Sequence, residues 1–144
     1  MNTRGLRNNN PGNIRRGSSW KGLSSVQSDK FFCKFNSMEY GIRAFFVLMR
    51  TYKYKHKLST LSDVLHRFAP LSENNTDAYI AHCRKFIREN GYQGCYIDDQ
   101  THVNFWFNSK NPSKLLRVFA RAVFLMETGR NFTDDEIQKG IDLL

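Results

Sequence analysis

One glutamate ends the most apolar segment of the chain, where a carboxyl group is suited to acid catalysis. Glu127 follows apolar residues that cover most of the circumference of a helix expected over Pro112–Thr128, a pattern typical of a helix buried at the centre of a domain. The negative end of the helix dipole and partial burial both favour the protonated carboxyl group. A protonated carboxyl group can act as a general acid. The alternative is a surface side chain that pairs with Arg130.

Two further glutamates are candidates for a second catalytic group, because glycosidases generally use two carboxyl groups. Glu39 lies at the start of a helix expected after Asn36-Ser37, and its alternative role is to complete the cap of that helix together with Asn36. Glu73 precedes a helix expected from residue 74, where it could polarise a water molecule or hold substrate. Its alternative is a solvated loop acid.

Side chains suited to binding a sugar are concentrated in the N-terminal part of the chain. Amide groups both donate and accept hydrogen bonds, and aromatic faces stack on the apolar faces of sugar rings. The candidates for substrate binding are Asn9, Asn10, Asn13, Trp20, Tyr40 and Tyr79. Turn formation by asparagine and ordinary core packing by the aromatic residues are the alternatives.

The spacing of apolar residues and capping residues predicts a mainly α (α+β) protein. Two short strands, Ile14–Arg16 and Lys30–Phe35, are expected to form a small N-terminal β-hairpin. Helix starts are expected at Asn36-Ser37, Thr60, Asn74-Asn75-Thr76, Asn111-Pro112 and Thr133. The length of 144 residues predicts a single domain over 1–144.

Composition excludes several classes of protein. The net charge of +9 and the pI of about 9.7 favour binding to a polyanion such as nucleic acid, anionic lipid or an acidic bacterial envelope polymer. The longest apolar runs are too short to span a bilayer, and the first residues carry no apolar segment, so neither a membrane span nor a signal peptide is expected. The three cysteines and four histidines lack metal-ligand spacing. No cofactor and no metal site is therefore expected.

Three segments resemble a family of phage and prophage proteins that are virion structural proteins or peptidoglycan hydrolases with a lysozyme-like fold. They are Arg7-Asn8-Asn9-Asn10-Pro11-Gly12-Asn13-Ile14-Arg15, Trp20-Lys21-Gly22 and Phe35–Ala44. The first of them contains the Asn-Asn-Pro-Gly-Asn string of the family. The later segments Arg67-Phe68-Ala69-Pro70 and Glu73–Tyr79 are similar to the same family.

A more distant similarity connects the chain to bacterial cell-wall glucosaminidases, in which a glutamate at the end of a buried helix precedes an Asn-rich loop. Phe124–Gly129 resembles that helix but follows the loop in this chain. The resemblance implies a circularly permuted lysozyme-like domain with Glu127 as its catalytic acid. Phe68 stands where the family has tyrosine, so any role of that hydroxyl is lost or passes to Tyr79.

We therefore expect an enzyme that cleaves the glycan strand of peptidoglycan, of the muramidase, glucosaminidase or lytic transglycosylase type. Its expected partners are peptidoglycan strands and components of a phage virion. It would act from the virion, or from the host cytoplasm after release by another component. The alternatives are a catalytically silent virion or wall-binding protein, and a nucleic-acid binder suggested by the charge and by Tyr52-Lys53-Tyr54-Lys55. The enzyme hypothesis requires Glu127 and the Asn8–Asn13 loop to meet at one groove.

Overall fold

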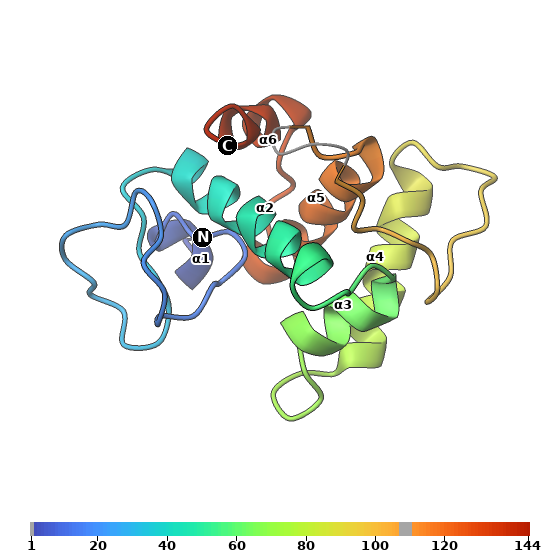
Figure 1. Cartoon of the computed structure of the whole chain (residues 1–144), viewed down its shortest axis with the longest axis horizontal. Coiled ribbons are helices and arrows are strands. Elements are labelled where there is room, and N and C mark those ends of the chain that lie inside the picture. The colour runs from blue at the N-terminus through green and yellow to red at the C-terminus, as the bar shows by residue number, and fades with distance from the viewer. Residues whose placement is uncertain (1, 107–110) are drawn as a thin grey trace.

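A computed structural model describes residues 2–106 and 111–144, and that part of the chain is mainly helical (Figure 1). The helices are α1 (Arg4–Arg7), α2 (Met38–Tyr54), α3 (Leu61–Phe68), α4 (Thr76–Glu89), α5 (Lys114–Thr128) and α6 (Asp134–Ile141). Helix α2 crosses the middle of the molecule and packs against α6, while α4 packs against both α3 and α5. The mainly helical prediction is confirmed.

Local capping chemistry sets most of the helix starts, as the sequence predicts. The Thr60 side chain caps α3 and the Asn75 side chain caps α4, each by accepting a hydrogen bond from a backbone N–H of the first turn. Thr133 and Glu136 form the complete capping box of α6. At the other end of α5, Gly129 adopts a left-handed φ of 77° and ends the helix.

Two predicted helix starts differ from the structure. Helix α5 begins after Ser113, whose side chain accepts from the N–H of Leu116, so Pro112 lies before the helix and not at its first position. At the start of α2, the N-cap is Ser37 without a side-chain cap bond. The predicted cap that joins Asn36 and Glu39 is therefore wrong. The four-residue helix α1 has no apolar periodicity and was not expected.

Residues 12–35 do not form the predicted β-hairpin. Only two isolated antiparallel bridges, Arg15–Phe32 and Leu23–Phe35, occur in this segment. At the first bridge the N–H of Arg16 donates to Phe31 and that of Cys33 donates to Ile14, but side chains bond to neighbouring backbone groups as well. The Asn10 amide, for example, donates to the carbonyl oxygens of Ile14 and Cys33.

Helix α2 joins two hydrophobic clusters. Phe45 and Phe46 lie in the main core between the helices, with Phe119 and Phe124 of α5. A smaller cluster of Ile14, Cys33, Phe35 and Ala44 lies under the N-terminal segment. We call residues 2–36 the N-terminal lobe and residues 38–106 and 111–141 the helical lobe. Because α2 contributes to both clusters, it holds the two lobes in a fixed relation.

A glycine lets the N-terminal lobe approach α2 closely. A Cβ atom on Gly41 would lie 1.9 Å from the backbone oxygen of Asn9, which no side chain could accommodate.

None of the helices in the described part of the chain has the length and apolar character needed to cross a bilayer.

Candidate active site

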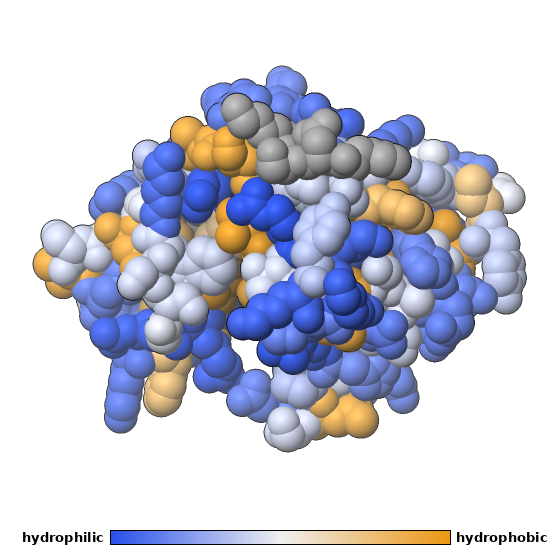
Figure 2. All heavy atoms as spheres, viewed as in Figure 1, coloured by the Kyte–Doolittle hydropathy of each residue, from blue (hydrophilic) through white to orange (hydrophobic). Residues whose placement is uncertain are grey.

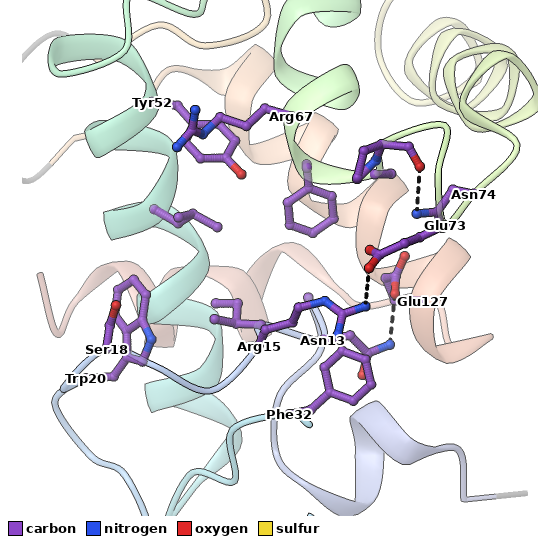
Figure 3. Close-up of a pocket in the computed structure, with 16 residues that line it drawn as sticks. Asn13, Arg15, Ser18, Trp20, Phe32, Tyr52, Arg67, Glu73, Asn74 and Glu127 are labelled. Atoms are coloured by element: carbon purple, nitrogen blue, oxygen red, sulfur yellow. Dashed lines mark hydrogen bonds and ion pairs between the residues drawn. The ribbon is translucent and has the colours of Figure 1, made fainter. Parts of the chain in front are cut away.

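A groove of about 600 Å³ lies between the N-terminal lobe and the helical lobe. Figure 2 shows the surface indented between these two parts of the molecule, and Figure 3 shows the side chains that face the groove. The lining residues come from three regions far apart in the sequence: the Asn-rich loop and its continuation, helix α2 with the α3–α4 connection, and the end of α5. They are Gly12, Asn13, Ile14, Arg15, Ser18, Trp20, Phe32, Leu48, Tyr52, Arg67, Phe68, Ala69, Pro70, Glu73, Asn74 and Glu127.

Both carboxyl oxygens of Glu127 accept hydrogen bonds from neutral side chains. The Asn13 amide Nδ2 donates to Oε1 over 2.8 Å, and the Tyr79 hydroxyl donates to Oε2 over 2.7 Å. Among the described residues no cation lies within ion-pair distance of Glu127. Arg130 pairs instead with Glu136, so the surface pair considered from the sequence is not formed. The required meeting of Glu127 with the Asn-rich loop is present in the structure.

The position of Asn13 follows from the geometry of its loop. Asn13 has a φ of 47°, a left-handed conformation that asparagine tolerates better than most residues. The buried Asn10 side chain fixes the loop, because its amide also accepts from the N–H of Ile14. Gly12 packs closely against the ring of Phe45 in the main core. The loop therefore directs the Asn13 amide towards the end of α5.

Tyr79 positions Glu127 and is not a stacking surface for a sugar. Its ring is only 4% exposed and packs edge-on against Phe68. Burial, and then the charge and hydrogen bond of Glu127, raise the pKa of Tyr79 well above 10. The hydroxyl thus stays protonated and remains a donor. The structure thus places the Tyr79 hydroxyl against the carboxyl group of Glu127.

Glu73 also faces the groove, where it forms an ion pair with Arg15. The Arg15 Nη2 atom lies 3.1 Å from Oε1 of Glu73, and the pair connects the N-terminal lobe to the α3–α4 connection (Figure 3). The Arg15 guanidinium also lies over the ring of Phe32. Both side chains are about half exposed, so the pair adds little to stability. Its position makes Glu73 a candidate second carboxyl group.

Asn9, Asn10 and Tyr40, which the sequence predicts to bind substrate, do not line the groove. Asn9 donates its amide to the carbonyl oxygen of Phe35. Asn10 is fully buried and is bonded to backbone groups. Tyr40 packs against the small cluster beneath Gly22, where a Cβ atom would collide with the ring. These side chains stabilise the N-terminal lobe, which leaves Asn13 as the asparagine of the loop that can contact a ligand.

The remaining candidates divide between the groove and the surface. Glu39 lies in the first turn of α2 and is not among the lining residues. Trp20 does line the groove, although part of its ring packs against the small cluster. Its Nε1 atom is buried and has no hydrogen-bond partner among the described residues. A ligand that reaches this wall would meet an apolar indole face.

Sequence reasoning missed the contribution of α2 and the end of α3 to the groove. Tyr52 is buried and lines the groove together with Arg67. From the sequence alone, Tyr52 is interpreted as part of the alternating run Tyr52-Lys53-Tyr54-Lys55, which suggests a nucleic-acid-binding surface. The helical periodicity that places Phe45 and Met49 in the core also places Tyr52 inward, and this signal could have identified it.

Glu127 stands where two cavities meet. A second cavity of about 290 Å³ is lined by Asn74, Asn75, Ala78, Tyr79, Met126 and Glu127. Glu127 and Asn74 line this cavity and the larger groove alike. A ligand in either cavity could therefore contact Glu127. The described residues contain no cluster of three or more metal-binding side chains.

Comparison with known proteins gives one clear relative. No protein-family model matches the chain. The chain is 33% identical over 144 residues to a protein named protein P5 of Pseudoalteromonas phage PM2, and the match covers 96% of this chain and 80% of that protein. This coverage includes both the Asn-rich loop and the end of α5.

Proposed function

The chain belongs to the family of protein P5 of phage PM2, and from this premise we propose that it is a phage enzyme that cleaves the glycan strand of peptidoglycan. The observation that carries the proposal is the position of Glu127. Its carboxyl group lies in a groove between two lobes, both of its oxygens are held by neutral donors, and it has no ion-pair partner among the described residues. A positioned acid of this kind is typical of a catalytic group.

In the proposed reaction Glu127 is the general acid that protonates the oxygen of the bond being cleaved. Hydrogen bonds from neutral donors orient a carboxyl group and favour its ionised form less strongly than a cationic partner does. Asn13 and Tyr79 hold Glu127 in place by two such bonds. Since they approach from different lobes, the orientation of the acid depends on the packing of the two lobes against each other.

Glu73 is the proposed second carboxyl group. Positive charge develops on the sugar ring as the glycosidic bond breaks, and a carboxylate in the same groove stabilises that charge or activates water. Arg15 fixes Glu73 at the edge of the groove. If Glu73 activates water, the product carries a free reducing end. If it does not, internal attack leaves an anhydro-sugar, and the two products differ in mass by one water molecule.

The shape and charge of the protein suit a polymeric substrate. Cavities on both sides of Glu127 give room for sugar units on both sides of the cleaved bond. Trp20 supplies an aromatic wall on which a sugar ring can stack. The net charge of +9 attracts the protein to an anionic cell wall.

The test is the clearing of a suspension of purified sacculi. The wild-type protein should lower the turbidity and release soluble fragments, and Glu127→Gln should remove this activity while the thermal midpoint stays close to the wild-type value. Glu89→Gln is the matched control, because Glu89 is exposed at the end of α4 outside the groove. Equal clearing by the Glu127→Gln and Glu89→Gln variants would refute the proposed role of Glu127.

We also propose that the protein is associated with the phage virion, on the basis of its phage relative. Mass spectrometry of purified particles should then detect the chain in a constant ratio to the major coat protein. Its loss from particles on purification, with recovery in the lysate alone, would indicate release from the host cytoplasm instead.

A further inference from the structure

The groove contains two arginines in different electrostatic situations. Arg15 is paired with Glu73, as described above. Arg67 also lines the groove, but among the described residues no carboxylate lies within ion-pair distance of its guanidinium. The Arg67 side chain extends from α3 towards α2, and its guanidinium carbon lies 5.5 Å from the centre of the Tyr52 ring (Figure 3). A cation in the last turn of a helix would ordinarily turn towards its own carbonyl groups.

Basic residues lie near Arg67. Desolvation, and then the charges of Arg67 and Lys55, lower the pKa of His56. Figure 2 shows hydrophilic side chains gathered over the carboxyl end of α2 and over α3. The Arg67 guanidinium therefore offers a cationic partner to a substrate anion at this end of the groove.

Tyr52 prepares Arg67 for such an anion. Tyr52 is buried in the last turn of α2, and the guanidinium carbon of Arg67 lies over its ring, 5.5 Å from the ring centre. Burial raises the pKa of the Tyr52 hydroxyl against the opposing charge and hydrogen bond of Arg67, so the hydroxyl remains neutral. A guanidinium held in place presents its N–H groups in the fork geometry that matches a carboxylate.

We propose that Arg67, supported by Tyr52, binds a carboxylate of the substrate at the end of the groove. This inference rests on the proposed function, because it assigns the substrate of that function a charged group. In peptidoglycan the carboxylate has two sources. One is the peptide attached to the glycan strand, and the other is the lactyl group that is exposed when the peptide is removed.

Equilibrium binding of three ligands distinguishes the sources. The protein carries Glu127→Gln so that no ligand is cleaved, and the ligands are peptide-bearing glycan strands, amidase-treated strands and neutral N-acetylglucosamine oligomers, at about 0.15 M salt. Tighter binding of the peptide-bearing strands assigns the carboxylate to the peptide, and tighter binding of the treated strands assigns it to the lactyl group. We expect the preferred strands to bind about fivefold more tightly than the neutral oligomer, as for an exposed ion pair.

Adding Arg67→Gln to the Glu127→Gln protein should remove the preference for carboxylate-bearing strands over the neutral oligomer. The affinity for the neutral oligomer itself should stay within about twofold of that of the Glu127→Gln protein. Arg67→Lys, which keeps the charge but loses the fork, should retain part of the preference. Lys85→Gln is the charge-matched control, because Lys85 is exposed on α4 outside the groove, and it should retain the full preference.

The proposal is overturned if the parent protein shows no preference, if Arg67→Gln keeps it, or if Lys85→Gln loses it to the same degree. Failure of the proposed function has a different signature. In that case the protein without the Glu127 substitution releases no fragments from the strands, whatever the binding constants are.

Discussion

The amide of Asn13 donates a hydrogen bond of 2.8 Å to Glu127 across 114 positions of the chain. One partner belongs to the N-terminal lobe and the other to the last turn of α5. The bond therefore connects the Asn-rich loop directly to the candidate acid. It also makes the loop a part of the candidate site and not only of the fold.

Removing the Asn13 amide should reduce the catalytic rate without weakening substrate binding. Asn13→Gly keeps the left-handed backbone and deletes only the side chain, so the loop should retain its course. We expect kcat for soluble glycan strands to fall by about tenfold to a hundredfold, because a misplaced catalytic group loses much of its effect. KM should stay within about twofold. A fall in kcat/KM caused by KM alone would contradict this role.

The Tyr79 hydroxyl should be needed for the rate more than for the fold. Tyr79→Phe preserves the packing on Phe68 and removes one hydrogen bond to Glu127, which should lower the free energy of unfolding by about 1 kcal/mol. We expect kcat to fall by about tenfold. Tyr54→Phe is the control, because the Tyr54 hydroxyl bonds to the backbone of Trp106 outside the groove. Similar kcat values for the two variants would exclude the positioning role.

Asp29 should make the N-terminal lobe sensitive to acid. The hydrogen bond from the N–H of Phe31, with smaller contributions from Phe32, Asn8 and Arg4, lowers the pKa of Asp29 from 3.8 to about 2 against the opposing effect of burial. A lowered pKa in the folded state stabilises the protein above pH 4, and this stabilisation is lost as the pH falls through about 2.

Thermal unfolding at several pH values tests this role of Asp29. Asp29→Asn should lower Tm by about 3–6 °C at pH 5, because it removes charged hydrogen bonds. The difference between wild type and variant should shrink between pH 4 and pH 2. A difference that is constant over this range would show that the carboxylate charge does not stabilise the lobe.

Asn10 should be essential for the fold of the loop. Its buried side chain bonds to Ile14 through both N–H and C=O groups and to the carbonyl oxygen of Cys33. Asn10→Ala leaves these buried groups without partners, so we expect a loss of about 2–3 kcal/mol in the free energy of unfolding, measured by urea denaturation. Asn36→Ala, at an exposed position, should change it by less than about 1 kcal/mol. Equal effects of the two variants would contradict the structural role of Asn10.

Local signals in the sequence were sufficient to predict most helices of this protein. Thr60, Asn75 and Thr133 act within one helical turn of their own positions, so their effect does not depend on the rest of the fold. The N-terminal lobe lacks such local determinants. Its backbone is satisfied by side chains such as Asn10, and the number of bonds that such a side chain makes cannot be read from its residue type.

The candidate site was predictable only in part, for the same reason. The apolar helix and its terminal Glu127 are visible in the sequence, and the juxtaposition with Asn13 followed from a resemblance. Asn9, Asn10 and Asn13 have identical side chains, however, and only the tertiary structure shows that one of them reaches the groove. The same applies to Arg67, whose environment depends on the packing of α3 against α2.

The mass spectrum of fragments released from purified sacculi tests most directly whether the protein cleaves a glycosidic bond with Glu127. We predict soluble glycan fragments with intact peptides, ending in a reducing or an anhydro-sugar, from the wild-type protein and from Glu89→Gln but not from Glu127→Gln. Fragments cut within the peptides, or glycan fragments of equal yield from Glu127→Gln, would contradict this prediction.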